Sequence, residues 1–497
     1  MFLFLAGGAG QALLNDADTG YHIRAGDYML TAHAIPEHDI FSQHEPPLPW
    51  TTHEWLSEIA MALVHQWAGL TGVVLLFSLV LALTYACLFP LLAGRGANIL
   101  LAAAVALVTI VASSQHWLAR PHLFSYLLTV VWYGILLDFA EQRRNRLLLL
   151  PLLTILWVNL HGGFAVGFLL LGLFLVDSLW RALTLPAERA QALAAARQLT
   201  VTLTAVLAAS AINPFGWHIL WFPFRVVGDA FLMDHVAEFL APNFHEAVTF
   251  KYFLLLLVAL FALGRQRLHV REVLITLCFL DMALVSSRHI PLFVILMSPV
   301  VLRLAQEMIA GSEATVPRIV RGLGARIATL DREANNALWP MAGIIAVIVC
   351  AASGQLNRTF DPNLKAVDAV RFLAAEPIPG HVFNTDEIGD YMIYAAWPRY
   401  RVFFDGRSDM YGAGRLKEYI RISRLESGWQ ELLDRYDIGW LFVQPDCVLA
   451  RHLMESPGDW HLVYADRVAR IFVRDRPEYQ DIIGRHPKVT PPPLSED

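Results

Sequence analysis

Long apolar stretches recur along this 497-residue chain and limit its possible folds more than any other feature. Each is about 15 to 22 residues long, close to the roughly 20 residues that a helix needs to cross a bilayer. The sequence predicts about eleven membrane spans, near 1–14, 73–94, 97–113, 122–140, 146–161, 163–180, 198–213, 249–264, 271–287, 290–306 and 338–355. The first is short and lacks the basic start of a signal peptide, so we interpret it as a shortened span, with a signal peptide as the alternative.

Composition agrees with a membrane protein. Hydrophobic residues make up 56% of the chain and charged residues only 16%, against about a quarter charged in soluble domains. The net charge of −6 is small for this length and does not indicate nucleic acid as a partner. Three of the four cysteines, Cys87, Cys278 and Cys350, lie in apolar stretches, so no disulfide framework or cysteine metal site is indicated. The predicted partner is the lipid bilayer.

Basic residues predict which side of the membrane each loop faces, because Lys and Arg are retained in short cytoplasmic loops. Arginines gather in alternate loops, near residues 95, 143–146, 181–197, 265–271 and 303–332. Most histidines fall in the opposite loops, which include two long segments, 15–72 and 213–248. We therefore expect these two segments to lie outside the cytoplasm.

Three segments between the spans have helical patterns. Residues 52–68 have apolar positions at helical spacing and predict an interfacial helix. Aromatic residues at 217–224 indicate a helix at the outer membrane surface. Arginines interleaved with apolar residues over 312–336 predict a cytoplasmic amphipathic helix, with a solvated connector as the alternative.

The last part of the chain, 357–497, differs from the membrane region, 1–356. Short β-rich runs lie at 381–384, 400–404, 438–443, 461–464 and 469–473, and helical patterns at 364–375, 415–435 and 446–454. Strands that alternate with helices predict a soluble α/β domain, and the number of spans places it on the outer side. The predicted fold is an α-helical polytopic membrane protein with a C-terminal α/β domain.

The first outer loop concentrates ionisable side chains near an apolar boundary. They include Asp16, Asp18, His22, Asp39, His53 and Glu54. Partial desolvation makes a carboxylate more basic, which suits it to remove a hydroxyl proton, and two carboxylates together can instead hold a divalent cation. Asp18 is the first candidate for a general base. The alternative for these acids is a solvated loop residue, a helix cap or a structural ion pair.

Arginine and histidine occur together at the outer ends of two predicted spans, as Arg120 with His122 and as Arg288 with His289. An arginine near the interface can bind a phosphate bidentately, and a histidine can add a donor. Such arginines can also merely anchor helix ends. Arg288 is the stronger candidate, because Pro291 follows it and would open the backbone beside a cavity.

Other polar segments allow two interpretations each. His161 precedes two glycines, so it either faces the outer cavity or belongs to a compact helical hairpin. Glu238 lies in the second outer loop, where it either joins an acceptor or metal site or has no function. Residues 403–411, which read FFDGRSDMY, either cover the membrane cavity and contact a carbohydrate or form a salt-bridged turn that holds the α/β domain together.

The order of these elements resembles the GT-C superfamily of polyprenyl-phosphate-sugar-dependent glycosyltransferases, in particular bacterial membrane proteins similar to the protein mannosyltransferase and aminoarabinose transferase group. Asp16-Ala17-Asp18 occupies the position of the family's acidic motif, and residues 35–42 resemble the loop segment that follows it. The resemblance covers the whole membrane region in layout, but its specific motifs occupy only about the first fifty residues.

This resemblance implies a sugar donor linked to polyprenyl phosphate and a general base in the first outer loop, with Asp16 and Asp18 as catalytic candidates. It also implies a place in the bacterial cytoplasmic membrane, with the C-terminal domain in the periplasm. The sugar and the acceptor are not specified. No cofactor is assigned, and use of a divalent cation stays open.

Two other functions remain open from the sequence. A multi-span transporter would have ionisable residues near mid-membrane and repeated halves, yet only Asp138, Asp177 and Asp281 lie within or beside the spans, and no repeat is evident. A non-catalytic scaffold for envelope assembly is the other alternative, and in it the acidic loop would be structural.

Overall fold

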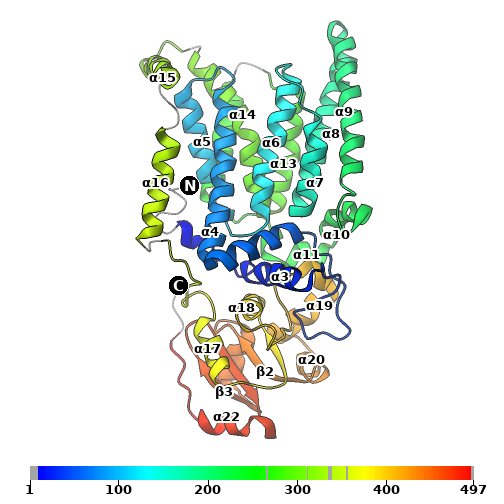
Figure 1. Cartoon of the computed structure of the whole chain (residues 1–497), viewed down its shortest axis with the longest axis vertical. Helices are drawn as coiled ribbons and strands as arrows, with labels where there is room; N and C mark the ends of the chain where they lie inside the picture. Colours follow the sequence, from blue (N-terminus) through cyan, green and yellow to red (C-terminus); the bar gives the residue numbers. More distant parts are fainter. Residues whose placement is uncertain (1–8, 265–266, 311, 334–337, 354–355, 494–497) are drawn as a thin grey trace.

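The computed structural model describes residues 9–264, 267–310, 312–333, 338–353 and 356–493. A bundle of helices forms one half of the molecule, and a smaller domain with a sheet forms the other half, below it in Figure 1. Helix α3 and the start of α4 lie across the long axis of the molecule, between the two halves (Figure 1). The predicted combination of a helical membrane region and a C-terminal α/β domain is therefore confirmed.

Apolar helices account for the predicted spans after the first. They are α4 (Trp55–Ala93), α5 (Ile99–Ser113), α6 (His122–Ala140), α7 (Leu149–Leu160), α8 (Ala165–Thr184), α9 (Arg189–Ala209), α12 (Val248–Leu263), α13 (Val270–Val285), α14 (Ile290–Ala310) and α16 (Leu338–Ala352). In the described part of the chain, six helical segments are long and apolar enough to cross a membrane. Six is fewer than the eleven predicted, because several spans form helices of only 12 to 16 residues.

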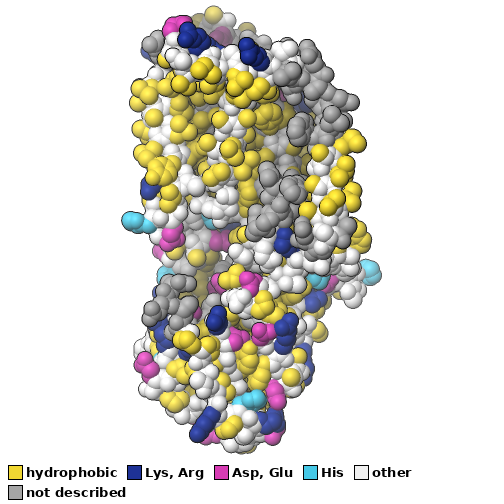
Figure 2. Space-filling view, turned by 90° about the vertical axis from the view of Figure 1, so that its left-hand side faces the viewer, with side chains coloured by type: hydrophobic (Ala, Val, Ile, Leu, Met, Phe, Trp, Pro, Cys, Tyr) yellow, Lys and Arg dark blue, Asp and Glu magenta, His cyan; other side chains and the backbone are white. Residues whose placement is uncertain are grey.

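The predicted first span, 1–14, lies mostly outside the described residues, and within them α2 (Ala9–Ala12) is helical. On the face shown in Figure 2, hydrophobic side chains are spread over the helical half, whereas charged side chains gather at its upper end and over the lower domain. Helix α15 (Thr315–Glu333) lies at the end of the bundle opposite the α/β domain, so the helix predicted over 312–336 is confirmed in the described part of that segment (Figure 1).

The first outer loop forms two helices that cross each other. Helix α4 breaks at Ala68 and Gly69, where Gly69 has a φ of 58°, and the part before this break matches the predicted interfacial helix. Helix α3 (Thr19–Ala32) packs against α4, and the sequence patterns did not indicate it. At the crossing, a Cβ on Gly26 would lie 2.0 Å from the backbone oxygen of Glu58. The absence of a side chain at Gly26 therefore permits the close contact that positions both helices.

The second outer loop consists of short helices on the same side of the bundle as α3. They are η4 (Gly216–Trp221), α10 (Phe222–Gly228), α11 (Ala230–His235) and η5 (Ala237–Phe239). Trp217, Trp221 and Phe224 are exposed, which agrees with aromatic rings at a membrane surface.

The α/β domain contains a four-stranded sheet in the order β1-β2-β4-β3. Its strands are β1 (His381–Asn384), β2 (Ile438–Val443), β3 (Trp460–Ala465) and β4 (Arg470–Arg474), and its helices are α17 (Val367–Ala375), α18 (Asp386–Ala396), α19 (Ser408–Ser423), α20 (Trp429–Arg435), α21 (Val448–Glu455) and α22 (Gln480–Arg485). Strand β1 pairs with β2 in parallel, and β4 pairs with both β2 and β3 antiparallel. Every residue of β2 is buried, as expected for an inner strand of apolar sequence.

Two predictions for this domain were wrong. Residues 400–404 are not a strand of the sheet, because Val402 forms a bridge with Ser42 of the first outer loop instead. The predicted helix 415–435 is two helices, which separate where Gly428 adopts a φ of 85°. The chain at 400–404 thus ties the α/β domain to the first outer loop.

Candidate functional site

Ionisable side chains gather where the first outer loop lies between the helical bundle and the α/β domain. We distinguish three clusters. The Arg120 cluster consists of Asp16, Asp18, Arg120 and Glu238; the Glu54 cluster of His22, His53, Glu54, Glu58 and His161; and the Arg407 cluster of Asp39, Asp405, Arg407 and Tyr411.

The Arg120 cluster places one guanidinium among three carboxylates. Arg120 forms ion pairs with Asp16 and Glu238, and its Nη2 lies 3.0 Å from Oδ2 of Asp18. Asp18 stands at the N-terminus of α3, but its side chain makes no capping hydrogen bond there. A helix cap therefore does not explain Asp18, and the cluster carries more negative than positive charge.

The α/β domain covers Asp18 from below. A Cβ on Gly406 would lie only 2.2 Å from Oδ1 of Asp18, and the backbone N–H of Gly406 donates to Oδ1 of Asp390 at 3.1 Å. Burial raises the pKa of Asp18 well above its usual value, and the charge of Asp390 and its hydrogen bond with Asp18 raise it further. Burial and the charge of Asp405 raise the pKa of Asp390 as well. The two carboxyl groups therefore retain a shared proton more readily than free aspartates do.

Arg288 lies beside this cluster in η6 (Ser287–His289). The hydroxyls of Ser286 and Ser287 donate to the backbone oxygen of Glu238 at 3.0 and 3.4 Å. Although burial raises the pKa of Glu238, the charges of Arg120 and Arg288 lower it to about 2. Arg288 is half-buried and stands 5.0 Å from the ring centre of Phe239. Among the described residues, no carboxylate forms an ion pair with Arg288, so its guanidinium is available to an anion.

The two predicted histidine neighbours of these arginines each use one ring nitrogen locally. His122 donates from Nε2 to the backbone oxygen of His116 at 2.9 Å, and His289 donates from Nδ1 to that of Met282 at 3.3 Å. Each histidine therefore keeps its other ring nitrogen for a further contact.

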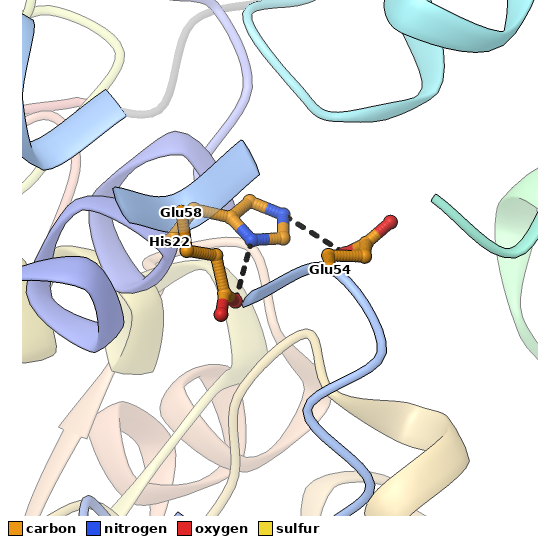
Figure 3. A group of neighbouring side chains, drawn as sticks. All are labelled: His22, Glu54 and Glu58. Atoms are coloured by element: carbon orange, nitrogen blue, oxygen red, sulfur yellow. Dashed lines mark hydrogen bonds and ion pairs between the residues drawn. The ribbon is translucent and has the colours of Figure 1, made fainter. Parts of the chain in front are cut away.

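In the Glu54 cluster, imidazoles surround two buried glutamates. Nδ1 of His22 lies 3.1 Å from Oε1 of Glu58, and its Nε2 lies 3.8 Å from Oε2 of Glu54 (Figure 3). His53 and His161 approach Oε1 of Glu54 through their Nε2 atoms, at 3.7 and 3.4 Å. Burial lowers the pKa of His22 to about 3 and raises that of Glu54 to about 7. The His22 imidazole is therefore neutral at pH 7.

His161 has a defined tautomer. The backbone N–H of Gly163 donates to its Nδ1 at 2.9 Å, and burial holds the pKa of His161 well below its usual value. The single ring proton therefore belongs to Nε2, which faces Glu54. Of the two interpretations of His161 from the sequence, the structure supports a side chain that faces other polar groups, here those of the Glu54 cluster.

The Arg407 cluster is the most buried of the three. Arg407 is 2% exposed; its Nη1 contacts Oδ1 of Asp39 at 2.9 Å, and its Nε and Nη2 contact both oxygens of Asp405 at 2.7 Å. The hydroxyl of Tyr411 donates to Asp405 at 2.7 Å. Burial opposes the charge of Asp39, but Arg407 and hydrogen bonds lower its pKa. This geometry supports the salt-bridged turn among the two interpretations of residues 403–411, and it gives Asp39 a structural partner.

The structure thus brings Asp16 and Asp18 together with Arg120, and His22 together with His53, Glu54 and His161. Sequence reasoning missed Glu58 and did not place Asp390 against Asp18. Glu58 follows Glu54 by four residues, the spacing that aligns side chains on one helix face, and this signal could have found it. The contact between Asp18 and Asp390 joins positions 372 residues apart, and no local pattern indicates it.

Comparison with known proteins adds a likeness of fold. No family model matches the chain, and no curated protein matches it in sequence. Among solved structures, it is similar to the archaeal oligosaccharyltransferase AglB from Archaeoglobus fulgidus, which was solved with an inhibitory peptide and a dolichol-phosphate. The TM-score is 0.49 at 12% identity, and the likeness covers 86% of this chain and 65% of that chain. The chain thus spans slightly less than two thirds of that enzyme's length.

Proposed function

We propose that this chain is a glycosyltransferase that takes a sugar from a polyprenyl-phosphate carrier at the outer face of the membrane. The observation that carries the proposal is the half-buried guanidinium of Arg288, which has no carboxylate partner in the described chain and lies next to the Arg120 cluster. A cation that is ready for a phosphate and a carboxyl with a raised pKa are the two groups that such a transfer needs.

Arg288 binds the phosphate of the donor in this proposal. A guanidinium pairs with two phosphate oxygens at once and stabilises the negative charge of the leaving group as the bond between sugar and phosphate breaks. Arg120 has a different role, because Asp16, Asp18 and Glu238 already surround its guanidinium. It holds the acidic motif in place. His122 and His289 each give the proton of one ring nitrogen to a backbone oxygen, so each donates to the phosphate from its other nitrogen only in the protonated, cationic form.

Asp18 accepts the proton of the acceptor. The acceptor oxygen or nitrogen attacks the anomeric carbon from the side opposite the phosphate, its proton passes to Asp18, and the polyprenyl phosphate leaves with the bonding electron pair. The configuration at the anomeric carbon is therefore inverted. Because Asp18 shares a proton with Asp390, it acts as a base once the pair has lost that proton, and its raised pKa then makes it a stronger base. Asp16 supports Asp18 through Arg120.

A transfer assay in membranes tests this proposal. A radiolabelled polyprenyl-phosphate sugar serves as donor, and the native chain is compared with Arg288→Gln and Arg288→Lys. We expect Arg288→Gln to lower transfer at least tenfold and Arg288→Lys to restore part of it, since lysine keeps the charge but loses the bidentate geometry. Arg225→Gln is the matched control, because Arg225 is an exposed outer arginine over the ring of Phe222. It should leave transfer within about twofold of the native rate.

Equal transfer by native chain and Arg288→Gln would remove Arg288 from the phosphate site. Uptake of a solute into vesicles without any sugar transfer would instead favour the transporter alternative.

A further inference from the structure

An imidazole and two carboxyl groups meet in the Glu54 cluster at the spacing of a metal site. His22, Glu54 and Glu58 each offer one ligand atom, and these atoms lie within 4.8 Å of one another. They come from three different places: His22 from α3, Glu54 from the residue before α4, and Glu58 from the first turn of α4. Figure 3 shows the imidazole of His22 between the two carboxylates.

One carboxylate oxygen of this cluster has no partner. Glu58 is 2% exposed, and its Oε1 contacts Nδ1 of His22. Its Oε2 is buried and has no hydrogen-bond partner among the described residues. A buried polar atom without a partner destabilises the folded chain, and more so when it carries charge. A bound ion or small molecule would give this oxygen a partner.

The charges around the cluster favour a cation as that partner. The guanidinium of Arg407 lines the same small cavity as Glu54 and Glu58, but Asp39 and Asp405 hold it. Asp409 lines this cavity too and adds negative charge. A cation bound between Glu54 and Glu58 would therefore meet acidic groups and, among the described residues that line this cavity, no free guanidinium.

We propose that His22, Glu54 and Glu58 bind a divalent transition-metal ion of the Zn²⁺ or Mn²⁺ type. An imidazole nitrogen with two carboxylate oxygens suits these ions, whereas Mg²⁺ and Ca²⁺ prefer oxygen ligands alone. Three protein ligands are fewer than the four of a structural zinc site, so one position is left for water from the cavity. This site does not include Asp16 or Asp18, and it does not depend on the proposed transfer reaction.

Metal binding by the full-length, tag-free chain in detergent tests the proposal. The protein is stripped with a chelator, titrated with Zn²⁺, separated from free ion and analysed for metal content. We expect about one Zn²⁺ per native chain, and at least tenfold weaker binding by Glu58→Gln and by Glu54→Gln. His65→Gln is the matched control, because His65 is a half-buried histidine on the same helix that contacts the hydroxyl of Tyr394; it should bind as the native chain does.

Co²⁺ gives a second measurement on the native chain, which does not depend on the folding of any variant. We expect visible absorption bands from Co²⁺ coordinated by nitrogen and oxygen, and Zn²⁺ should displace them. Less than 0.1 equivalent of Zn²⁺ on the native chain, or no such Co²⁺ bands, would overturn the proposal. Equal binding by folded Glu58→Gln and native protein would overturn the ligand assignment.

Discussion

The Arg120 and Arg407 clusters use the same chemical groups at the same boundary and differ in how completely the charges are satisfied. Arg407 is almost fully buried, and two aspartates and a tyrosine complete its surroundings. Arg120 faces three carboxylates, and its side chain is 16% exposed. A saturated ion cluster holds two parts of a chain together, whereas a cluster with surplus charge has groups left for chemistry.

The pKa directions in the two clusters express this difference. In the Arg407 cluster, the pKa of Asp39 is lowered, because burial is outweighed by Arg407 and by hydrogen bonds. In the Arg120 cluster, the pKa of Asp18 is raised, because burial and the neighbouring Asp390 both disfavour its charged form. Perturbed acids of the second kind are typical of functional sites, although ion networks can also produce them. The comparison therefore predicts opposite effects of mutation in the two clusters.

Replacement of Arg407 should have the largest effect on stability. Arg407→Gln leaves Asp39 and Asp405 buried without a counter-charge, so we expect a loss of about 3–5 kcal/mol in the free energy of unfolding. Chemical unfolding in detergent, followed by tryptophan fluorescence, measures this loss. The control Arg371→Gln breaks an exposed pair with Asp368 and should cost less than about 1 kcal/mol. A native-like stability of Arg407→Gln would show that this cluster does not hold the α/β domain in place.

Replacement of Asp18 should lower activity, whereas replacement of Asp39 should lower stability. Asp18→Asn removes the proposed base and should lower sugar transfer about 100-fold or more, while the free energy of unfolding stays equal or rises, because one of two adjacent carboxyl groups is gone. Asp39→Asn should do the reverse: it lowers stability by about 1–3 kcal/mol and leaves transfer per folded molecule nearly native. Transfer rates normalised to the amount of folded protein, with unfolding curves of the same samples, measure both quantities. If Asp18→Asn transferred sugar as fast as the native chain, Asp18 would not be the base.

The sequence predicted the membrane helices and the α/β domain because both depend on local patterns. Apolar stretches and alternating strands and helices are visible within about 20 residues of chain, and they located α5, α14 and β2. Helix α7 is shorter than its predicted span, 146–161, since apolar composition continues beyond the point where the helix begins, whereas α12 and α13 match their predicted spans within two residues at each end. Residues 400–404 were misread as a strand, because an apolar run does not reveal that Val402 pairs with Ser42 instead of the sheet.

The candidate site was predictable in its residues but not in its partners. Asp18, Arg120 and Arg288 were identified as outer polar groups near the boundary. That Arg120 faces the acidic motif, while Arg288 lacks an acid, depends on how η6 and the second outer loop pack. The contact of Asp18 with Gly406 and Asp390 depends on the docking of the α/β domain. Patterns of charge and hydrophobicity along the chain do not predict contacts between residues that are this far apart in the sequence.

A methyl group at Gly406 should disturb the Arg120 cluster without touching the Arg407 pairs. In Gly406→Ala, the new Cβ would lie 2.2 Å from Oδ1 of Asp18, so the carboxyl group must move away. We expect transfer to fall about tenfold, since a displacement of about 1 Å is costly in an oriented site. Gly414→Ala is the matched control, because a Cβ there meets nothing within 4 Å and Gly414 lies in α19. It should keep native transfer, and a parallel loss in both variants would contradict the role of Asp18.

The smallest effect we expect concerns pH and the pair of Asp18 and Asp390. Each acid has a raised pKa in the folded protein, so the folded state binds protons more readily than the unfolded state. The pair therefore stabilises the fold fully below the ordinary aspartate pKa of 3.8, and this contribution is lost as pH rises through the raised pKa values. Asp390→Asn leaves one acid, so the loss of stability with rising pH should become smaller.

The same variant should shift the pH dependence of transfer. A base works in its deprotonated form, so native transfer should increase as pH rises through the pKa of the pair. Asp390→Asn removes the charge of Asp390 and its carboxyl hydrogen bond, which both raise the pKa of Asp18, and the increase in transfer should therefore move to lower pH. Asp368→Asn, an exposed change in the same domain, should leave the profile in place. If Asp390→Asn left the pH profile of transfer unchanged, deprotonation of Asp18 would not be the step that controls transfer. The Arg120 cluster would then have a structural role alone, as the Arg407 cluster does.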